Sequence, residues 1–299
     1  MNFQKNFKYF FLLPVALVVL SLVAIAVWGL KPGLDLQGGS LLQVSYSQSR
    51  PDANLVRGVT SNLGLGEIRI QPTGTNSYTL RARTLSNDEK NNLETALGKL
   101  GQMKEGQFTS IGPTIGSELL NKAMIAIVLV VFCIIVFISF AFRHVSKPVA
   151  SWKYGVVAII TLAHDILIPA GLFALLGHFV GAEIDALFIV ALLTILGISI
   201  NDTIVVFDRI RENLRKNEET RRSEEYASVI GRSIMQTLVR SINTSLTVVI
   251  VLAALYFVGP AATHDFALTL IVGMIAGTYS SIFLAAPLLV VWQQWQKKV

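Results

Sequence analysis

Long apolar stretches, each with at most two charged or histidine side chains, recur six times along the chain of 299 residues. They lie at residues 9–30, 123–142, 154–176, 186–207, 234–258 and 266–292. About 20 apolar residues in a helix cross the hydrocarbon core of a bilayer. Helices in soluble cores usually run about 8–20 residues and show a polar face. The pattern therefore predicts a membrane all-α bundle of six transmembrane helices.

Lysine and arginine gather in alternate connections between these stretches. They occur at Lys5, Lys8, Arg143, Lys147, Lys153, Arg209, Arg211, Arg215, Lys216, Arg221, Arg222, Arg232, Lys297 and Lys298, whereas residues 178–185 and 259–265 contain neither. Short loops rich in these residues stay in the cytoplasm. We therefore expect a cytoplasmic N-terminus at 1–8, a cytoplasmic loop at 208–233 and a cytoplasmic tail at 293–299.

The first apolar stretch has a second interpretation, as a secretory signal. Basic residues precede it, and Ala24-Ile25-Ala26 resembles a small-residue cleavage site. The apolar run continues to Leu30, which is longer than a typical signal core and favours a membrane span.

Residues 31–121 form the one long segment patterned like a water-soluble domain. Alternating or helical apolar spacing predicts strands at 41–47, 67–71, 78–83 and 108–111, a helix at 53–63 and a second helix after a capping box of Ser86 and Glu89. The order βαββαβ predicts a small α+β extracytoplasmic domain of ferredoxin-like type. The segment has no histidine, which excludes a Ser-His-Asp arrangement within it. We expect no enzymatic activity.

Glycine and proline mark both ends of this predicted domain. Gly33, Gly38 and Gly39 follow the first span, and Gly112-Pro113 precedes the second. One interpretation is a pair of surface turns. The other is a pair of hinges that let the domain rotate as a body on its membrane anchor.

Composition narrows the class of protein. Hydrophobic residues make up 53% of the chain and charged residues 15%, against about 25% charged in an average soluble domain. A single cysteine, Cys133, excludes a disulfide within the chain, and four scattered histidines offer little for a metal centre. We expect no metal and no cofactor. The net charge of +6 is explained by the loop pattern, and no motif supports nucleic-acid binding.

Two ionisable residues inside the predicted spans carry the functional argument. Asp202 lies six residues from Asp208, about 9 Å into the membrane, and Arg240 lies eight residues from Arg232, about 12 Å by the same helical rise. One helix runs inward and the next outward, so the two groups reach similar depth and an ion pair is geometrically reasonable. Polar support at this level comes from residues Asn201, Asn243 and Thr244.

His164 and Asp165, near the middle of the third span, form a secondary pair of protonatable groups. Charged groups in a bilayer are costly, and such residues usually face a partner or water. Protonatable groups at different depths suit a proton relay, in which making and breaking the Arg240 contact changes the proton affinity of Asp202. The alternative is that both pairs are static bonds between helices.

Several motifs in these spans resemble the SecF family of protein-export membrane proteins, within the SecD/SecF group of the RND superfamily. They are LGISINDTIVVFDRIREN at 196–213, RSINTSLT at 240–247, HDI at 164–166 and GTYSSIF at 277–283. The predicted topology extends the resemblance over the chain as half of an RND-type unit. One segment departs from it, because GLDLQGG at 33–39 is more similar to the sister subunit SecD.

The resemblance implies a proton-driven subunit in the cell inner membrane. Its implied partners are SecD, the SecYEG channel, YajC, the unfolded preprotein and membrane lipid. It implies proton conduction through Asp202 and Arg240, with a companion aspartate on SecD, during late-stage export. Two alternatives stay open. One is an RND-type exporter of small molecules or lipid, for which the outer domain is small, and the other is a structural scaffold without proton flow.

Overall fold

The computed structural model describes residues 10–141, 150–221 and 224–298. The chain divides into two compact units, one of residues 1–31 with 125–299 and one of residues 32–124. The predicted cytoplasmic N-terminus at 1–8 lies outside the described residues, as do Arg143, Lys147 and Arg222.

The unit of residues 32–124 is a four-stranded sheet with two longer helices. Its elements are α3 (Leu34–Gln37), β1 (Gly39–Tyr46), α4 (Ala53–Ser61), β2 (Arg69–Thr73), β3 (Ser77–Ala82), α5 (Asn87–Gly98) and β4 (Met103–Ile111). The strands pair antiparallel in the order β2-β3-β1-β4. Alternate residues of β1 and β3, among them Leu42, Val44 and Leu80, pack against Leu93 and Leu97 of α5. The predicted order of strands and helices is therefore present.

Local side-chain bonds start both longer helices of this unit. Asp52 accepts a hydrogen bond from the Asn54 backbone N–H ahead of α4. Ser86 and Glu89 form a reciprocal capping box ahead of α5, which confirms that sequence prediction. These bonds satisfy N–H groups that the first turn of a helix leaves without a partner.

The glycines at the two ends of this unit lie against each other. Gly38 has a φ of +77°, and a Cβ there would lie 2.7 Å from Pro113 Cα. A Cβ on Gly116 would lie 2.7 Å from the Gly38 nitrogen. Residues 33–39, predicted as a turn, contain the short helix α3. The structure therefore shows a close backbone contact at this place, and the hinge at Gly33, Gly38, Gly39, Gly112 and Pro113 stays a prediction.

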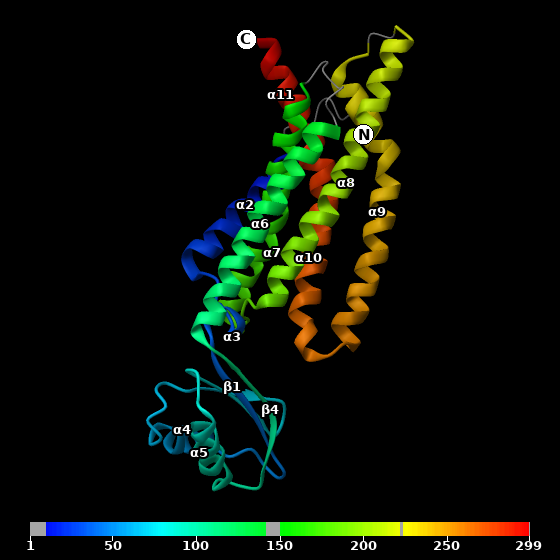
Figure 1. Cartoon of the computed structure of the whole chain (residues 1–299). Helices are drawn as coiled ribbons and strands as arrows, with labels where there is room; N and C mark the ends of the chain where they lie inside the picture. The colour runs from blue at the N-terminus through cyan, green and yellow to red at the C-terminus, as the bar shows by residue number, and fades with distance from the viewer. Residues whose placement is uncertain (1–9, 142–149, 222–223, 299) are drawn as a thin grey trace. The chain divides into compact units, whose positions relative to one another are not determined.

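The other unit consists of helices (Figure 1). They are α2 (Leu12–Trp28), the larger part of α6 (Pro113–Ala141), α7 (Ser151–Phe179), α8 (Ala186–Glu219), α9 (Tyr226–Val258), η1 (Ala261–Thr263), α10 (His264–Ser280), η2 (Ser281–Ala285) and α11 (Ala286–Lys298). Among the described residues, five helical segments are long and apolar enough to cross a membrane: α6, α7, α8, α9 and the run from Ala261 to Gln296. The first predicted span contains α2, which at 17 residues is shorter.

The connection between α8 and α9 is shorter than the loop predicted at 208–233. α8 continues to Glu219 and α9 begins at Tyr226, so most of this segment is helical. Asn213 on α8 donates to Ser233 Oγ at 2.8 Å and to Gln236 Oε1 at 2.9 Å on α9. The apolar pattern predicts that each span ends at its first charged residues. The hydrogen bonds of Asn213 keep α8 and α9 paired past those residues.

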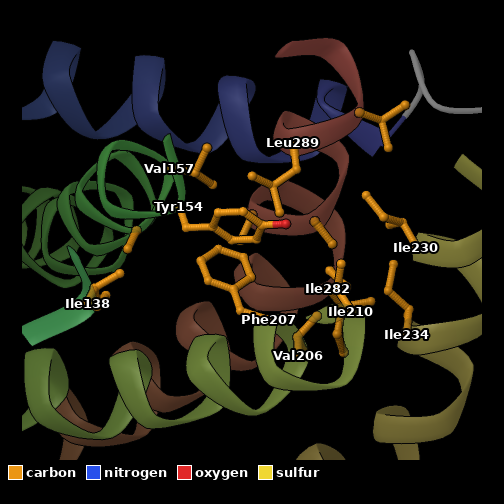
Figure 2. Packing of buried hydrophobic residues seen from close by; sticks show 14 of the residues in the cluster. Ile138, Tyr154, Val157, Val206, Phe207, Ile210, Ile230, Ile234, Ile282 and Leu289 are labelled. Atoms are coloured by element: carbon orange, nitrogen blue, oxygen red, sulfur yellow. The ribbon is translucent and has the colours of Figure 1, made fainter. Parts of the chain in front are cut away.

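Aromatic and branched side chains from α6, α7, α8, α9, η2 and α11 fill the largest apolar cluster (Figure 2). The rings of Tyr154 and Phe207 meet edge to face with centroids 5.2 Å apart. The final apolar run is not a uniform α-helix, because residues Ser281–Ala285 form a π-helical turn. Such turns are rare and often occur at functional sites. This turn directly follows the residues of α10 described next.

Candidate functional site

Asp202 lies in a buried contact between three helices. Its side chain on α8 is 6% exposed, and its Oδ2 lies 3.5 Å from Ser245 Oγ on α9. Thr278 Oγ1 on α10 lies 2.6 Å from the same serine oxygen. Glycines let α10 approach α8 here, since a Cβ on Gly273 would overlap Ile195 and one on Gly277 would lie 3.1 Å from Ser199 Cβ.

Arg240 does not share this buried contact. It interacts electrostatically with Asp202, yet no ion pair joins the two side chains in the part of the chain that the structure describes. Arg240 is exposed on α9, whereas Ser245 is buried. Five residues turn a helix by about 140°, which separates the two faces. The two residues are therefore close enough to interact electrostatically, but they do not form the ion pair that their similar depth predicted.

The predicted polar support also lies elsewhere. Asn201, Asn243 and Thr244 are all exposed, and the hydrogen-bonding groups beside Asp202 are Ser245 and Thr278. Ser245 and Thr278 lie within the quoted motifs RSINTSLT and GTYSSIF. Charge and depth alone did not single them out, because a hydroxyl group is common in apolar helices and gives no signal until its helix face is known.

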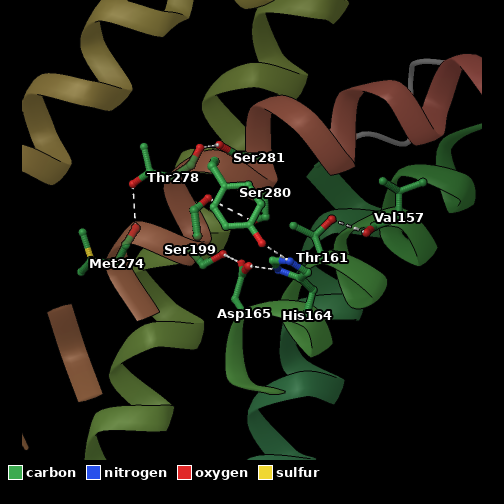
Figure 3. A network of polar contacts seen from close by, with 11 residues as sticks. Val157, Thr161, His164, Asp165, Ser199, Met274, Thr278, Ser280 and Ser281 are labelled. Atoms are coloured by element: carbon green, nitrogen blue, oxygen red, sulfur yellow. Dashed lines mark hydrogen bonds and ion pairs between the residues drawn. The ribbon is translucent and has the colours of Figure 1, made fainter. Parts of the chain in front are cut away.

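The secondary pair forms a second buried network (Figure 3). His164 is 2% exposed and Asp165 is fully buried. His164 Nδ1 lies 2.8 Å from Asp165 Oδ1, and Ser199 Oγ donates to Asp165 Oδ2. Tyr279 OH lies 2.5 Å from His164 Nε2. A neutral histidine with its proton on Nδ1 satisfies every member, since it donates to the carboxylate and accepts from the tyrosine. Ser199 and Tyr279 were not predicted.

The two networks meet on consecutive residues of α10. Thr278 belongs to the Asp202 contact and Tyr279 to the Asp165 contact. Asp202 and Asp165 also interact electrostatically. Four helices, α7, α8, α9 and α10, therefore build one polar centre with two carboxylates inside the apolar unit. A centre of this kind can hold and pass protons, because carboxyl, imidazole and hydroxyl groups all accept and donate them.

An apolar cavity of about 340 Å³ lies beside His164. Its other lining residues are Pro14, Val15, Val18, Val19, Ile160, Ala163, Leu167 and Leu284. A water needs two to four polar partners to be held in a cavity, and this lining offers one polar side chain. The cavity therefore gives little support for a water path to the centre from this side.

Asp185 lies away from this centre, at the start of α8. Asp185 caps α8 by accepting from the Phe188 N–H at 2.8 Å. Across the described part of the chain, no group of three His, Cys, Asp or Glu side chains is placed to hold a metal ion.

Comparison with known proteins places this geometry in a family. The model "Protein export membrane protein SecD/SecF, C-terminal" matches residues 92–295, and the "SecD/SecF GG Motif" matches residues 23–49. The chain belongs to the SecD/SecF family. The SecD/SecF motif model covers GLDLQGG, the segment that departs from the usual SecF form, so this segment is a family feature.

Curated relatives in the SecD/SecF family are SecF subunits. "Protein translocase subunit SecF" of Thermobaculum terrenum is 40% identical over 297 residues, which cover 95% of this chain and 91% of the relative. The protein of the same name from Anaerolinea thermophila is 36% identical, covering 96% and 93%. The chain is therefore SecF-like over nearly its whole length.

Solved structures of SecDF have the same fold. "SecDF, a translocon-associated membrane protein" from Thermus thermophilus aligns with a TM-score of 0.82 and 32% identity, over 98% of this chain and 39% of that one. SecDF in a super-membrane-facing form aligns with a TM-score of 0.70. This chain thus corresponds to well under half of the SecDF chain.

Proposed function

We propose that this SecF-like translocase subunit pairs with SecD and uses the proton gradient to drive late-stage export of preproteins through SecYEG. The role is transport and needs no catalysed covalent reaction. The observation that carries the proposal is Asp202, a carboxyl group buried between apolar helices beside the exposed cation Arg240. Placing an ionisable group in a membrane span costs free energy, and such groups commonly mark a proton or ion pathway.

The partner proposal follows from polar side chains that this chain leaves uncovered. Arg240, Asn243 and Thr244 on α9 and Asn201 on α8 are exposed within predicted spans. A charge facing lipid near the bilayer centre costs at least about 2.5–3.5 kcal/mol on insertion scales. The likeness to SecDF, whose chain is much longer than this one, supports SecD as the cover, with a companion aspartate opposite Arg240. YajC and the preprotein are further proposed partners.

The membrane arrangement is part of the same proposal. Six spans, with α2 as the first, place the lysine- and arginine-rich connections and both termini in the cytoplasm of a cell with this protein in its inner membrane. The all-antiparallel order β2-β3-β1-β4 with helices after β1 and β3 supports a ferredoxin-like outer domain.

Proton uptake at Asp202 supplies the proposed coupling. When Arg240 closes on Asp202, the charged carboxylate is stabilised, and when the two separate Asp202 takes a proton. A charge moved across 100 mV releases about 2.3 kcal/mol. That energy is enough to bias two conformations that differ by a few kcal/mol.

The test replaces Asp202 by Asn in vesicles that contain SecD, with proton flux and release of exported chain as readouts. We expect loss of both, because the amide cannot carry the proton. Asp208→Asn is the matched control, since Asp208 is on the same helix but half exposed and paired with Arg211 at 2.6 Å. Unchanged flux and release would favour the scaffold. Loss of dye or lipid export with normal secretion would favour the exporter.

A further inference from the structure

Four hydroxyl groups form a row that winds by about 120° around α9. They belong to Ser233, Thr237, Ser241 and Ser245, every fourth residue, and all four side chains are buried. Residues four apart lie one above the other on a helix. The row runs along α8, because Ser233 contacts Asn213 at one end and Ser245 contacts Asp202 at the other. It therefore leads from the end where α8 connects to α9 up to the buried carboxyl group.

The middle of the row contains an unsatisfied polar atom. Ser241 is 1% exposed, and its Oγ has no hydrogen-bond partner among the described residues. The Oγ1 of Thr203, the residue after Asp202, is a second such atom. A buried polar atom without a partner costs about 1–3 kcal/mol. In native proteins such atoms are commonly satisfied by ordered water.

The spacing of the row suits water. Four residues of helix rise about 6 Å. The two hydrogen bonds of a water meet at about 105–110°, so one water joins oxygens about 4.5 Å apart and two waters in sequence span about 6–7 Å. Two waters between each neighbouring pair of hydroxyl groups would therefore give a continuous hydrogen-bonded chain and would also supply the partner that Ser241 lacks. The O–H groups of Ser233 and Thr237 donate to the carbonyls of Val229 and Ser233, so their oxygens accept from these waters.

We propose that this face of α9 binds a file of water molecules through which protons pass between Asp202 and the α8–α9 connection. The inference rests on the proposed function and adds the route. Each water accepts one proton from its neighbour and gives one to the next, so no other reactant is needed.

Apolar side chains on the facing helix restrict this file. Val206 and Ile210 of α8 belong to the cluster that also contains Ile230 and Ile234 of α9 (Figure 2). The file thus has hydroxyl partners on α9 and apolar neighbours on the other side. Water fills it when α8 and α9 separate slightly, and the apolar contact limits proton leakage otherwise.

The first experiment measures water access with silver ions, which bind thiols. In a Cys133→Ala background with SecD present and a proton gradient imposed, Thr237→Cys and Ser241→Cys are exposed to silver ions. Protected thiols are then counted by maleimide labelling after denaturation. Leu252→Cys is the control, because Leu252 is buried on α9 within a separate apolar cluster. We expect protection at the two row positions alone. No reaction at Ser241→Cys, or equal reaction at Leu252→Cys, would overturn the proposal.

The second experiment measures proton flux in Ser241→Ala and Thr237→Val. Removing one hydrogen bond from the file should lower flux about two- to tenfold. Thr269→Val is the control, since Thr269 is also fully buried but donates to the Asp265 carbonyl at 2.6 Å, away from the row. If Asp202→Asn abolishes flux while the row variants match Thr269→Val, only the route is wrong. If Asp202→Asn leaves flux unchanged, the proposed function itself fails.

Discussion

Two aspartates in the same helical unit have different surroundings. Asp165 accepts from His164 and Ser199 and is fully buried, whereas Asp202 has one long contact to Ser245. Two donors hold the Asp165 carboxyl group in one orientation, whereas a single long contact leaves the Asp202 carboxyl group less constrained. The two carboxyl groups of the polar centre therefore differ in how firmly hydrogen bonds hold them.

Tyr279→Phe tests the fixed network. The substitution leaves the His164 Nε2 without its donor, and interhelical hydrogen bonds in membrane proteins contribute about 0.6–1.7 kcal/mol. We expect a lower thermal unfolding temperature in detergent. Tyr256→Phe serves as the control, because the Tyr256 ring packs on Phe257 and His264 away from the network. Equal unfolding temperatures for the two variants would contradict the assigned bond.

Glu89 gives the unit of residues 32–124 a pH-dependent stability. Hydrogen bonds from Arg83 and from the Ser86 backbone lower the pKa of Glu89 from 4.5 to about 2. Because the folded pKa is the lower one, the stabilisation is complete above about pH 4.5 and is lost as the pH falls through about 2. We expect hydrogen-exchange protection of α5 in the full chain to fall across this range. Glu89→Gln should flatten the profile, and a flattening by Glu67→Gln as well would contradict the assignment.

At the scale of elements, backbone contact joins α3 to the start of α6. Pro113 begins α6, where the fixed φ of proline suits a first helical turn. Gly38 and Gly116 allow the two backbones to touch. A rotation of the unit of residues 32–124 about both junctions independently would have to open this contact.

Gly116→Ala tests the contact. The added methyl group meets the Gly38 backbone, and such overpacking costs about 1–3 kcal/mol. We expect a lower unfolding temperature and faster hydrogen exchange at residues 34–39. The matched control is Gly112→Ala, because a Cβ on Gly112 has no described neighbour within 4 Å. If both variants behave like the unmodified protein, the contact opens freely and a hinge is the better interpretation.

At the scale of the whole molecule, one helix presents polar groups to its surroundings. α9 buries its hydroxyl row against α8, while Arg240, Asn243 and Thr244 face outward. A helix with both faces polar is unusual in lipid, because polar side chains there face a bundle interior or a partner. This arrangement fits a subunit whose membrane surface is completed by another chain.

The double variant Asn243→Leu with Thr244→Leu tests this cover. It should weaken co-purification with SecD while leaving the unfolding temperature of the isolated chain unchanged, because both side chains are exposed. Ile242→Ala is the control, since Ile242 is exposed and lies about 100° around α9 from Asn243 and about 160° from Thr244. Undiminished co-purification of the double variant would exclude this face as the site of pairing.

Sequence determined much of the fold because its signals are local. The length of an apolar run indicates a membrane span, and the apolar spacing at residues 41–111 indicates strands and helices. Ser86 and Glu89 form a helix cap within four residues of each other. A lone charge in an apolar run is equally visible, which is why Asp202, Arg240, Asp165 and His164 could be singled out. What lay beyond local reach was the helical continuation past 207 and before 234, which depends on Asn213 meeting the next helix.

Tertiary structure decided which groups meet. Tyr279 and His164 are 115 residues apart, and Ser245 and Asp202 are 43 apart. Their contacts depend on how each helix is rotated about its axis. The glycines of α10 influence this rotation, because they allow α10 to pack closely against Ile195 and Ser199 of α8. Depth in the membrane follows from residue number along one helix, whereas the direction in which a side chain points follows from the helices around it. For this reason the sequence placed Arg240 level with Asp202, and only the packed helices put Ser245 against Asp202 and turned Arg240 outward.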